Sequence, residues 1–210
     1  MNKLPEKIKT IASESEFRLK EKGSSFVSFS KPVKNVEEAV SFLSSLRKKY
    51  YDATHHCYSY QFVDGSFKYS DDGEPSGTAG KRIYNAQLHF ELTNLVTVVV
   101  RYYGGVKLGV GPLGKAYYEA AFQCLESSKI EILILHQRIQ IQYEFEFSNF
   151  IHHLISKYSL IIEKNIFEPQ PLLICSIRNS IIDQFSSELS ALPSNKIFPK
   201  RLDEWYYLEK

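Results

Sequence analysis

LVTVVVRYY, the stretch from Leu95 to Tyr103, is the strongest strand candidate in the sequence. Its β-branched valines favour extended structure, and the residues from Leu95 to Val100 are apolar on both faces. A strand with two apolar faces is typical of the centre of a sheet that is covered on both sides. We therefore expect this strand to be central in its sheet, with the surrounding elements packed around it.

Upstream of this strand, alternation and spacing of apolar residues predict further strands and helices. They are a hairpin from Ser13 to Ser30, a helix from Asn35 to Tyr50 that Asn35 caps, strands at His55 to Val63 and Phe67 to Tyr69, and a helix near Ala79 to Leu92. The two strands would be joined by a two-residue turn, Asp64-Gly65. Together these elements indicate a mixed α+β domain.

Two glycine-rich loops flank the central strand, from Ser70 to Gly80 and from Gly104 to Gly111. Each leads into a predicted helix. The second helix would begin at Pro112, which suits the first helical position, and end at about Ser128. A strand from Ile130 to Leu135 would close this part of the chain.

The residue composition changes after His136, because all ten glycines lie at or before Gly114. A strand is expected over residues 139–147, and Ser148 would cap the helix that follows.

A second helix in this half would begin at a capping box of Ser180 and Asp183. The order strand, helix, strand, strand, helix, strand over about 75 residues is the ferredoxin-like pattern. We therefore expect an α+β fold with two domains, residues 1–136 and 137–210.

The composition excludes several classes of protein. The 210 residues carry 26 Lys and Arg against 24 Asp and Glu, so the net charge of +2 gives no general case for nucleic acid, and any basic surface must be local. No apolar run approaches the ~20 residues of a membrane span, and residues 1–10 lack the apolar segment of an export signal. Three widely separated cysteines, Cys57, Cys124 and Cys175, support no disulfide framework. We expect a cytoplasmic protein without membrane contact.

A dinucleotide cofactor is the first alternative to test, because Gly109, Gly111 and Gly114 match the pattern Gly-x-Gly-x-x-Gly. In that fingerprint the first glycine directly follows the strand, whereas Gly109 comes six residues after Tyr103. The acidic residue expected at the end of the next strand is also missing, since that strand ends at Leu135. We expect no cofactor.

A metal ion is the second alternative, because Asp71, Asp72 and Glu74 are carboxylates close in sequence, and Mg²⁺ and Ca²⁺ prefer such oxygens. The opposite interpretation is a solvated acidic turn. The run His55-His56-Cys57 could suggest zinc, but only His55 and Cys57 share a face of a strand, and no second ligand pair follows at short spacing. No metal site is therefore assigned.

Phosphate is the ligand that the two glycine-rich loops favour. Backbone N–H groups at glycine-rich turns and helix N-termini attract anions, and basic side chains lie beside both loops. Tyrosines nearby could stack on unpaired bases, as in proteins that bind single-stranded RNA. The other interpretation is that these aromatic residues are core and that the glycines only permit tight turns. The candidate RNA or phosphate surface comprises Lys81, Arg82, Arg101, Tyr102, Tyr103, Gly104, Gly105, Lys107 and Lys115.

The same loops carry a resemblance to a known family. The stretches YSDDGEPSGTAG (69–80), VVVRYYGGVKLG (98–109), GPLGKAY (111–117), ATHHC (53–57) and KGSSF (22–26) resemble the signature of the YigZ/Impact family. The layout resembles the bacterial members over essentially the whole chain. Val110, Pro112 and Lys115 stand where the family more often has Thr, Gly and Arg. The residues that form the family's motif loop here are His55, His56, Asp71, Asp72, Gly73, Glu74, Pro75, Gly77, Thr78 and Gly80.

The resemblance implies an N-terminal α/β sandwich like a ribosomal-protein domain and domain IV of the translocation elongation factor, followed by a ferredoxin-like domain. Eukaryotic relatives are translational regulators with an extra protein-binding domain, and for the bacterial type the fold suggests association with nucleic acid or the ribosome. The leading hypothesis is therefore a non-enzymatic protein that binds RNA or the ribosome and acts in translation or its regulation. The alternatives are a metal-dependent enzyme that uses residues 71–74 on a phosphate-containing substrate, and a module that binds a protein partner through residues 137–210.

Overall fold

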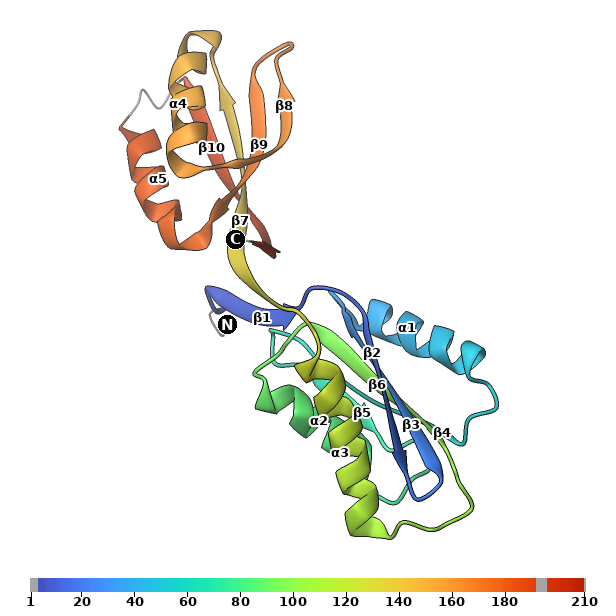
Figure 1. The fold of residues 1–210 in the computed structure, drawn as a ribbon. Helices are drawn as coiled ribbons and strands as arrows, with labels where there is room; N and C mark the ends of the chain where they lie inside the picture. The colour runs from blue at the N-terminus through green and yellow to red at the C-terminus, as the bar shows by residue number, and fades with distance from the viewer. Residues whose placement is uncertain (1–3, 192–195, 210) are drawn as a thin grey trace. The chain divides into compact units, whose positions relative to one another are not determined.

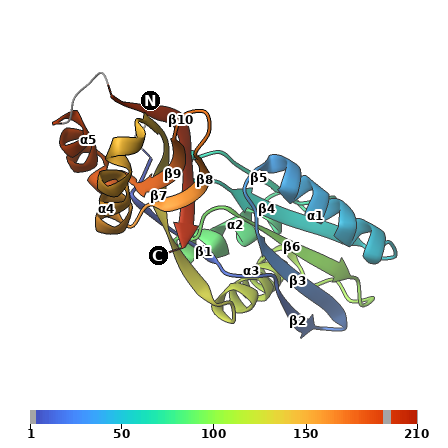
Figure 2. The same cartoon turned by 90° about the horizontal axis from the view of Figure 1, so that it is seen from above.

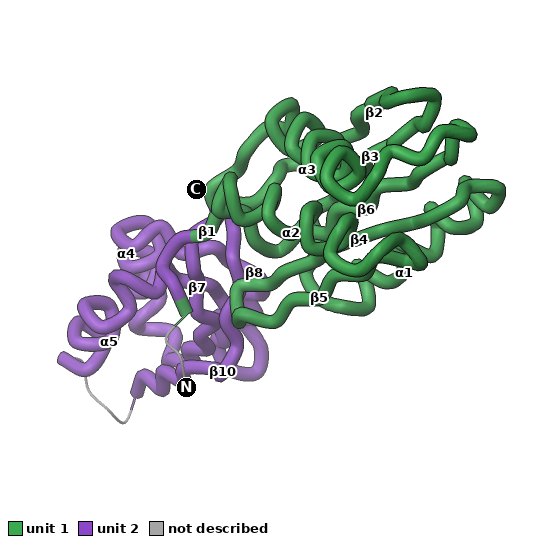
Figure 3. The backbone as a smooth tube through the Cα atoms, turned by 90° about the horizontal axis from the view of Figure 1, so that it is seen from below, with its two compact units in different colours: residues 1–4, 8–132 green, residues 5–7, 133–210 purple. Residues whose placement is uncertain are grey.

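The computed structural model describes residues 4–191 and 196–209, and the chain divides into two compact units (Figure 3). Within the described residues, unit 1 consists of Leu4 and residues 8–132, and unit 2 of residues 5–7 and 133–209. The break that the sequence suggests, after His136, lies inside a strand, β7 (Ile130–Tyr143). The two strands expected at residues 130–135 and 139–147 are therefore one continuous strand followed by a 3-10 turn, η1 (Phe145–Phe147).

Unit 1 is built on an antiparallel sheet whose strands lie in the order β2-β3-β6-β4-β5. The central strand is β6 (Leu95–Tyr102), so the prediction that this stretch is central is confirmed. The other strands are β2 (Ser15–Glu21), β3 (Ser24–Pro32), β4 (His55–Gln61) and β5 (Phe67–Ser70).

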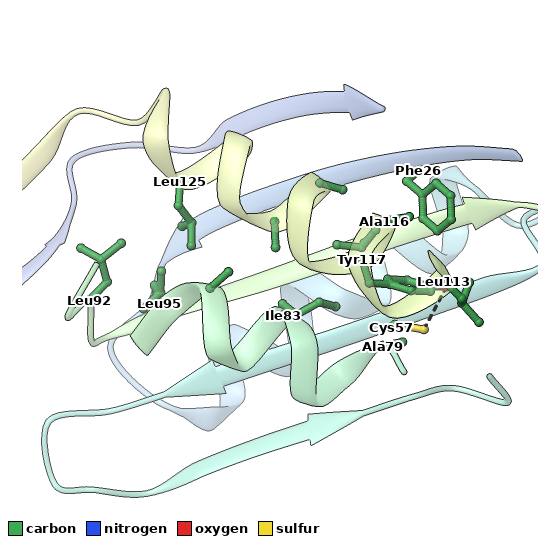
Figure 4. Close-up of a cluster of buried hydrophobic side chains, with 14 of the residues drawn as sticks. Phe26, Cys57, Ala79, Ile83, Leu92, Leu95, Leu113, Ala116, Tyr117 and Leu125 are labelled. Atoms are coloured by element: carbon green, nitrogen blue, oxygen red, sulfur yellow. Dashed lines mark hydrogen bonds between the residues drawn. The ribbon is translucent and has the colours of Figure 1, made fainter. Parts of the chain in front are cut away.

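Helices cover both faces of this sheet (Figures 1 and 2): α1 (Val36–Lys49) lies on one face, and α2 (Gly80–His89) and α3 (Val110–Glu126) lie on the other. The side chains of β6 alternate between the two. Leu95 and Val99 join the cluster under α2 and α3, which Figure 4 shows, whereas Val96, Val98 and Val100 join the cluster under α1. This double coverage explains why β6 is apolar on both faces. The predicted cap of α1 is confirmed, because the Asn35 side chain accepts from the Glu38 N–H.

Unit 2 has the ferredoxin-like arrangement. Its elements follow β7 as α4 (Ser148–Tyr158), β8 (Ile161–Ile166), β9 (Leu172–Arg178), η2 (Asn179–Ile181), α5 (Ile182–Ser190) and β10 (Ile197–Glu209). The antiparallel order is β8-β9-β7-β10, and β1 (Lys7–Ile11) also pairs with β7. Apolar side chains of α4 and α5 share one core with β7 and β9. The predicted α+β fold is therefore confirmed.

Details of several element ends differ from expectation. The hairpin between β4 and β5 pairs Gln61 with Phe67, which centres its turn on Asp64 and makes the turn longer than the expected Asp64-Gly65 pair. Helix α3 begins at Val110, so Pro112 is its third residue, still within the first turn where no N–H needs an intrahelical partner.

The expected caps of α4 and α5 are wrong. Neither helix has a side-chain cap: the Ser148 hydroxyl donates to the carbonyl of Phe145, and Asp183 lies in the first turn of α5 and accepts from Arg201. In both cases a 3-10 turn leads into the helix, so its backbone replaces the predicted side-chain cap. Among the helices of the described residues, none has the length and apolar character needed to cross a membrane.

Candidate functional site

The acidic run after β5 is held by the protein itself. One carboxylate oxygen of Asp71 accepts from the N–H groups of Ala79 and Gly80, both at 2.9 Å, and the other accepts from Gly77 at 2.8 Å. These donors lie at the start of α2, where the helix dipole attracts an anion. Asp71 therefore occupies the N-terminus of α2, which the sequence suggested was available to phosphate.

Asp72 joins the first loop to α1 and β4. Its carboxylate accepts from Arg47 at 2.9 Å and from the N–H of His56 at 2.7 Å. Its carbonyl accepts from Nδ1 of His55 at 2.8 Å, and Nε2 of His56 donates to the carbonyl of Tyr50 at 3.0 Å. Burial lowers the pKa of His56, because desolvation disfavours its charged form. Both histidines of the motif thus position backbone, and burial favours the neutral form of His56.

Glu74 is the centre of a buried polar cluster. Its Oε1 accepts from Nη1 of Arg101 at 2.6 Å and from the hydroxyl of Tyr117 at 2.7 Å. The thiol of Cys57 donates to the Tyr117 oxygen at 3.4 Å, and Nε2 of His55 lies 3.8 Å from the same carboxylate oxygen. Burial raises the pKa values of the Cys57 thiol and the Tyr117 hydroxyl well above their ordinary values. Both groups are therefore neutral and weak nucleophiles.

These partners separate the three carboxylates of the acidic run. Asp71 is directed to the α2 N-terminus, Asp72 to Arg47, and Glu74 to Arg101. Across residues 4–191 and 196–209, no three His, Cys, Asp or Glu side chains form a group suited to a metal ion. The run is neither the solvated turn nor the clustered ligand set that the sequence left open: each carboxylate has its own protein donors.

Arg101 differs most from its expected place. The sequence predicts an exposed phosphate ligand, but Arg101 is only 5% exposed, and its guanidinium carbon lies 5.4 Å from the ring centroid of Phe26 and 5.5 Å from that of Tyr103. Nη2 donates to the Ser24 hydroxyl, which also accepts from the N–H of Gly104. A polar side chain on a strand gives no signal of burial unless its partner is known, and here the partner, Glu74, is distant in sequence. Arg101 therefore connects the first hairpin to the second loop instead of facing solvent.

The second glycine-rich loop is exposed. Its backbone approaches the first hairpin so closely that a Cβ on Gly104 would lie 1.9 Å from the carbonyl carbon of Gly23. Beyond this contact, Tyr103, Gly105 and Lys107 are exposed. This loop is anchored at Gly104 and again at Leu108, which is buried in the core, and residues 105–107 between them are open to solvent.

The N-terminus of α3, which follows this loop, is open. No side chain caps it, its first turn contains no acidic residue, and Lys115 is exposed one turn further on. Gly109 precedes the helix with a φ of +82°. Of the two helix N-termini expected to receive anions, this is the one whose first turn holds no internal carboxylate.

The remaining residues of the candidate RNA or phosphate surface lie in different parts of unit 1. Lys81 and Arg82 are exposed in the first turn of α2, and Arg82 packs on α3, because a Cβ on Gly114 would lie 3.1 Å from its Nε. Figure 4 shows the first turns of α2 and α3 at the same end of unit 1, with Ala79 and Leu113 close together. Tyr102 instead packs with the α1 cluster and donates to Asp52, and its pKa is raised to about 12, chiefly by desolvation. The structure therefore leaves Lys81, Arg82, Tyr103, Lys107 and Lys115 exposed, whereas Arg101 is buried and contacts the Tyr103 ring, and Tyr102 packs on the α1 side of the sheet.

One aromatic cluster of this region is only partly expected from the sequence. Phe67, Tyr69 and Tyr84 stack on one another at the edge of unit 1, with ring centroids 4.9 to 6.4 Å apart. Two signals are present in the sequence: the spacing of Phe67 and Tyr69 places two rings on one face of a strand, and Tyr84 is one of the tyrosines near the loops that could stack on unpaired bases. The third ring comes from α2, so the cluster becomes visible only in the tertiary structure.

Known proteins resemble this chain over most of its length. The model of the Impact N-terminal domain matches residues 22–125. An IMPACT family member of Haemophilus influenzae is 31% identical over 188 residues, which cover 87% of this chain and 90% of that protein. The IMPACT family member YigZ of Escherichia coli is 31% identical over 175 residues, covering 80% and 85%. A crystal structure described as that of a hypothetical protein is 27% identical, with a TM-score of 0.71 over 96% of this chain and 100% of the other. The motif residues, the fold and these relatives agree: the chain belongs to the IMPACT family.

Proposed function

We propose that this protein binds RNA, free or within the ribosome, through the loop from Tyr103 to Lys115, and that it acts in translation or its regulation without catalysing a reaction. The observation that carries the proposal is the uncapped N-terminus of α3, which has no acidic residue in its first turn and lies between the exposed cations Lys107 and Lys115. Backbone N–H groups and the helix dipole at such an end attract phosphate, and the lysines add charge.

The rest of the surface supports the same ligand. Lys81 and Arg82 of α2 are exposed beside the first turns of α3, so they extend the positive charge beyond the loop. Two nearby acidic residues are already engaged by the protein, Asp71 by backbone N–H groups at the start of α2 and Glu74 by the counter-charge of Arg101. Cys57 and Tyr117 are held in their neutral forms, which favours binding over covalent catalysis. A role of this kind places the protein in the cytoplasm.

The test is the salt dependence of RNA binding. A dye-labelled single-stranded RNA is titrated with the full chain at several KCl concentrations, and the slope of log K against log[KCl] is measured. A double variant, Lys107→Ala with Lys115→Ala, should weaken binding and reduce the slope by about 2, since each lost phosphate contact removes about 1. The control is Lys34→Ala with Lys48→Ala, which removes the same charge at the two ends of α1, on the opposite face of the sheet.

The two double variants separate a local site from general attraction. If both variants changed affinity and slope equally, the loop would not be the binding site. Co-sedimentation of the full chain with purified ribosomal subunits tests the second part of the proposal, and the loop variant should remain in the supernatant while the α1 variant pellets with the wild-type protein. If the wild-type chain stayed in the supernatant, ribosome association would be contradicted.

A further inference from the structure

Three aromatic rings form a continuous stack on the surface of unit 1. The centroids of Phe67 and Tyr84 lie 4.9 Å apart with 13° between their planes. Tyr69 stacks on the same two rings at 6.1 and 6.4 Å, with angles of 30° and 22°. Phe67 and Tyr69 come from β5 and Tyr84 from α2, so two elements hold the rings nearly parallel.

The stack is not part of a hydrophobic core. Phe67 is 52% exposed and Tyr69 is 40% exposed, and none of the three rings belongs to the buried clusters on either face of the sheet. Strand β5 is also the edge of its sheet, a position that proteins commonly protect with charge or proline. Here the edge instead presents large apolar rings to solvent, which is typical of a binding surface.

The charges around the stack favour an anionic partner. Neither β5 nor α2 contains an acidic residue, whereas Lys81 lies one turn before Tyr84 and Arg82 follows Lys81. The acidic residues just outside these elements are engaged by the protein. Asp64 accepts from the backbone and hydroxyl of Ser66, and Asp71 accepts from the start of α2.

We propose that Phe67, Tyr69 and Tyr84 form a platform on which an unpaired base of single-stranded RNA stacks. The inference rests on the proposed function, because the loop and α3 would hold phosphates of the same strand, and Arg82 joins the two regions through its contact with Gly114. An aromatic face accepts any of the four bases, since each has a π-face. The platform would therefore add affinity without strong sequence preference.

The experiment is fluorescence anisotropy of a 5′-labelled oligouridylate twelve nucleotides long, titrated with the full chain. Phe67→Ala and Tyr84→Ala should each raise the dissociation constant by about 5- to 100-fold, the range for loss of one base–aromatic stack. The slope against salt should stay unchanged, because the rings are neutral. Phe67→Tyr and Tyr84→Phe keep the rings and should bind like the wild type. Tyr51→Ala, which removes a ring that is 84% exposed elsewhere in unit 1, is the matched control.

Phe67→Leu keeps an apolar side chain but removes the ring, so it distinguishes stacking from simple apolar contact. It also provides a second variant to test if an alanine variant folds poorly. Stacking requires the ring, so Leu should bind as weakly as Ala. A proline-rich or other apolar peptide would tolerate Leu, and wild-type affinity in Phe67→Leu would overturn the proposal. Equal weakening of polyphosphate binding, a ligand without bases, would overturn it as well.

The lysine variants of the loop separate this inference from the proposed function. If Lys107→Ala with Lys115→Ala reduced the salt slope while all ring variants bound normally, the platform would be wrong and the phosphate site would stand. If the wild-type chain bound no oligouridylate, both the stacking platform and the proposed RNA-binding function would be wrong. Loss of affinity at an unchanged slope in the ring variants, together with a reduced slope in the lysine variant, supports both proposals.

Discussion

Arg101 and Glu74 form an ion pair of 2.6 Å in which both side chains are almost completely buried, and this pair joins the central strand to the first glycine-rich loop. Arg101 is the second-last residue of the central strand β6, and Glu74 lies in the loop before α2. Tyr117 of α3 donates to the same carboxylate oxygen. The pair therefore holds the end of β6, the loop before α2 and the middle of α3 in one arrangement.

Removal of Arg101 tests this role. Arg101→Met should lower the free energy of unfolding by about 3–5 kcal/mol, because it leaves the Glu74 carboxylate buried without its counter-charge. Urea unfolding followed by circular dichroism measures the loss. Arg18→Met, which breaks the exposed pair with Glu16, should have a much smaller effect. Similar losses in the two variants would contradict a structural role for the Arg101–Glu74 pair.

A substitution at Gly104 tests the close approach of the second loop to the first hairpin. Gly104→Ala should lower the free energy of unfolding by at least about 1–3 kcal/mol, because its Cβ would collide with the backbone of Gly23, which cannot move as a side-chain end can. Gly111→Ala is the matched control, since nothing lies within 4 Å of a Cβ at that position in α3. It should leave stability unchanged or raise it by up to about 1 kcal/mol. The prediction fails if Gly104→Ala is as stable as the wild type.

His56 predicts a pH dependence of stability. Its pKa in the folded protein is lowered from the model-peptide value of 6.5, so the unfolded chain binds a proton more readily than the folded one. The stabilisation that neutral His56 contributes to the free energy of unfolding is therefore complete above about pH 6.5. It is lost as the pH falls below that value and through the folded-state pKa. Urea unfolding at pH 8 and pH 5.5 should show this decrease. In His56→Gln, which keeps an N–H for the carbonyl of Tyr50, the decrease should be smaller, and an equal decrease would contradict the assignment to His56.

Interactions between residues close in the chain allow much of the fold to be predicted from the sequence. The doubly apolar run from Leu95 to Val100 predicts a covered central strand, and Asn35 predicts the start of α1, because both signals act between near neighbours in the chain. The expected caps at Ser148 and Ser180 were wrong, since a backbone turn can replace a side-chain cap at little cost. The two strands expected around His136 are one, because nothing local ends β7 there.

The sequence by itself determined the central strand, the order of elements in the ferredoxin-like unit, and the motif that identifies the family. Only the tertiary structure decided which charged groups face solvent. Asp71, Glu74 and Arg101 look like surface ligands in the sequence, yet each is engaged by a group that the fold brings to it. It also assembled Phe67, Tyr69 and Tyr84 into a stack. The physical reason is that burial and pairing of polar and aromatic side chains depend on residues distant in the chain, which local pattern does not encode.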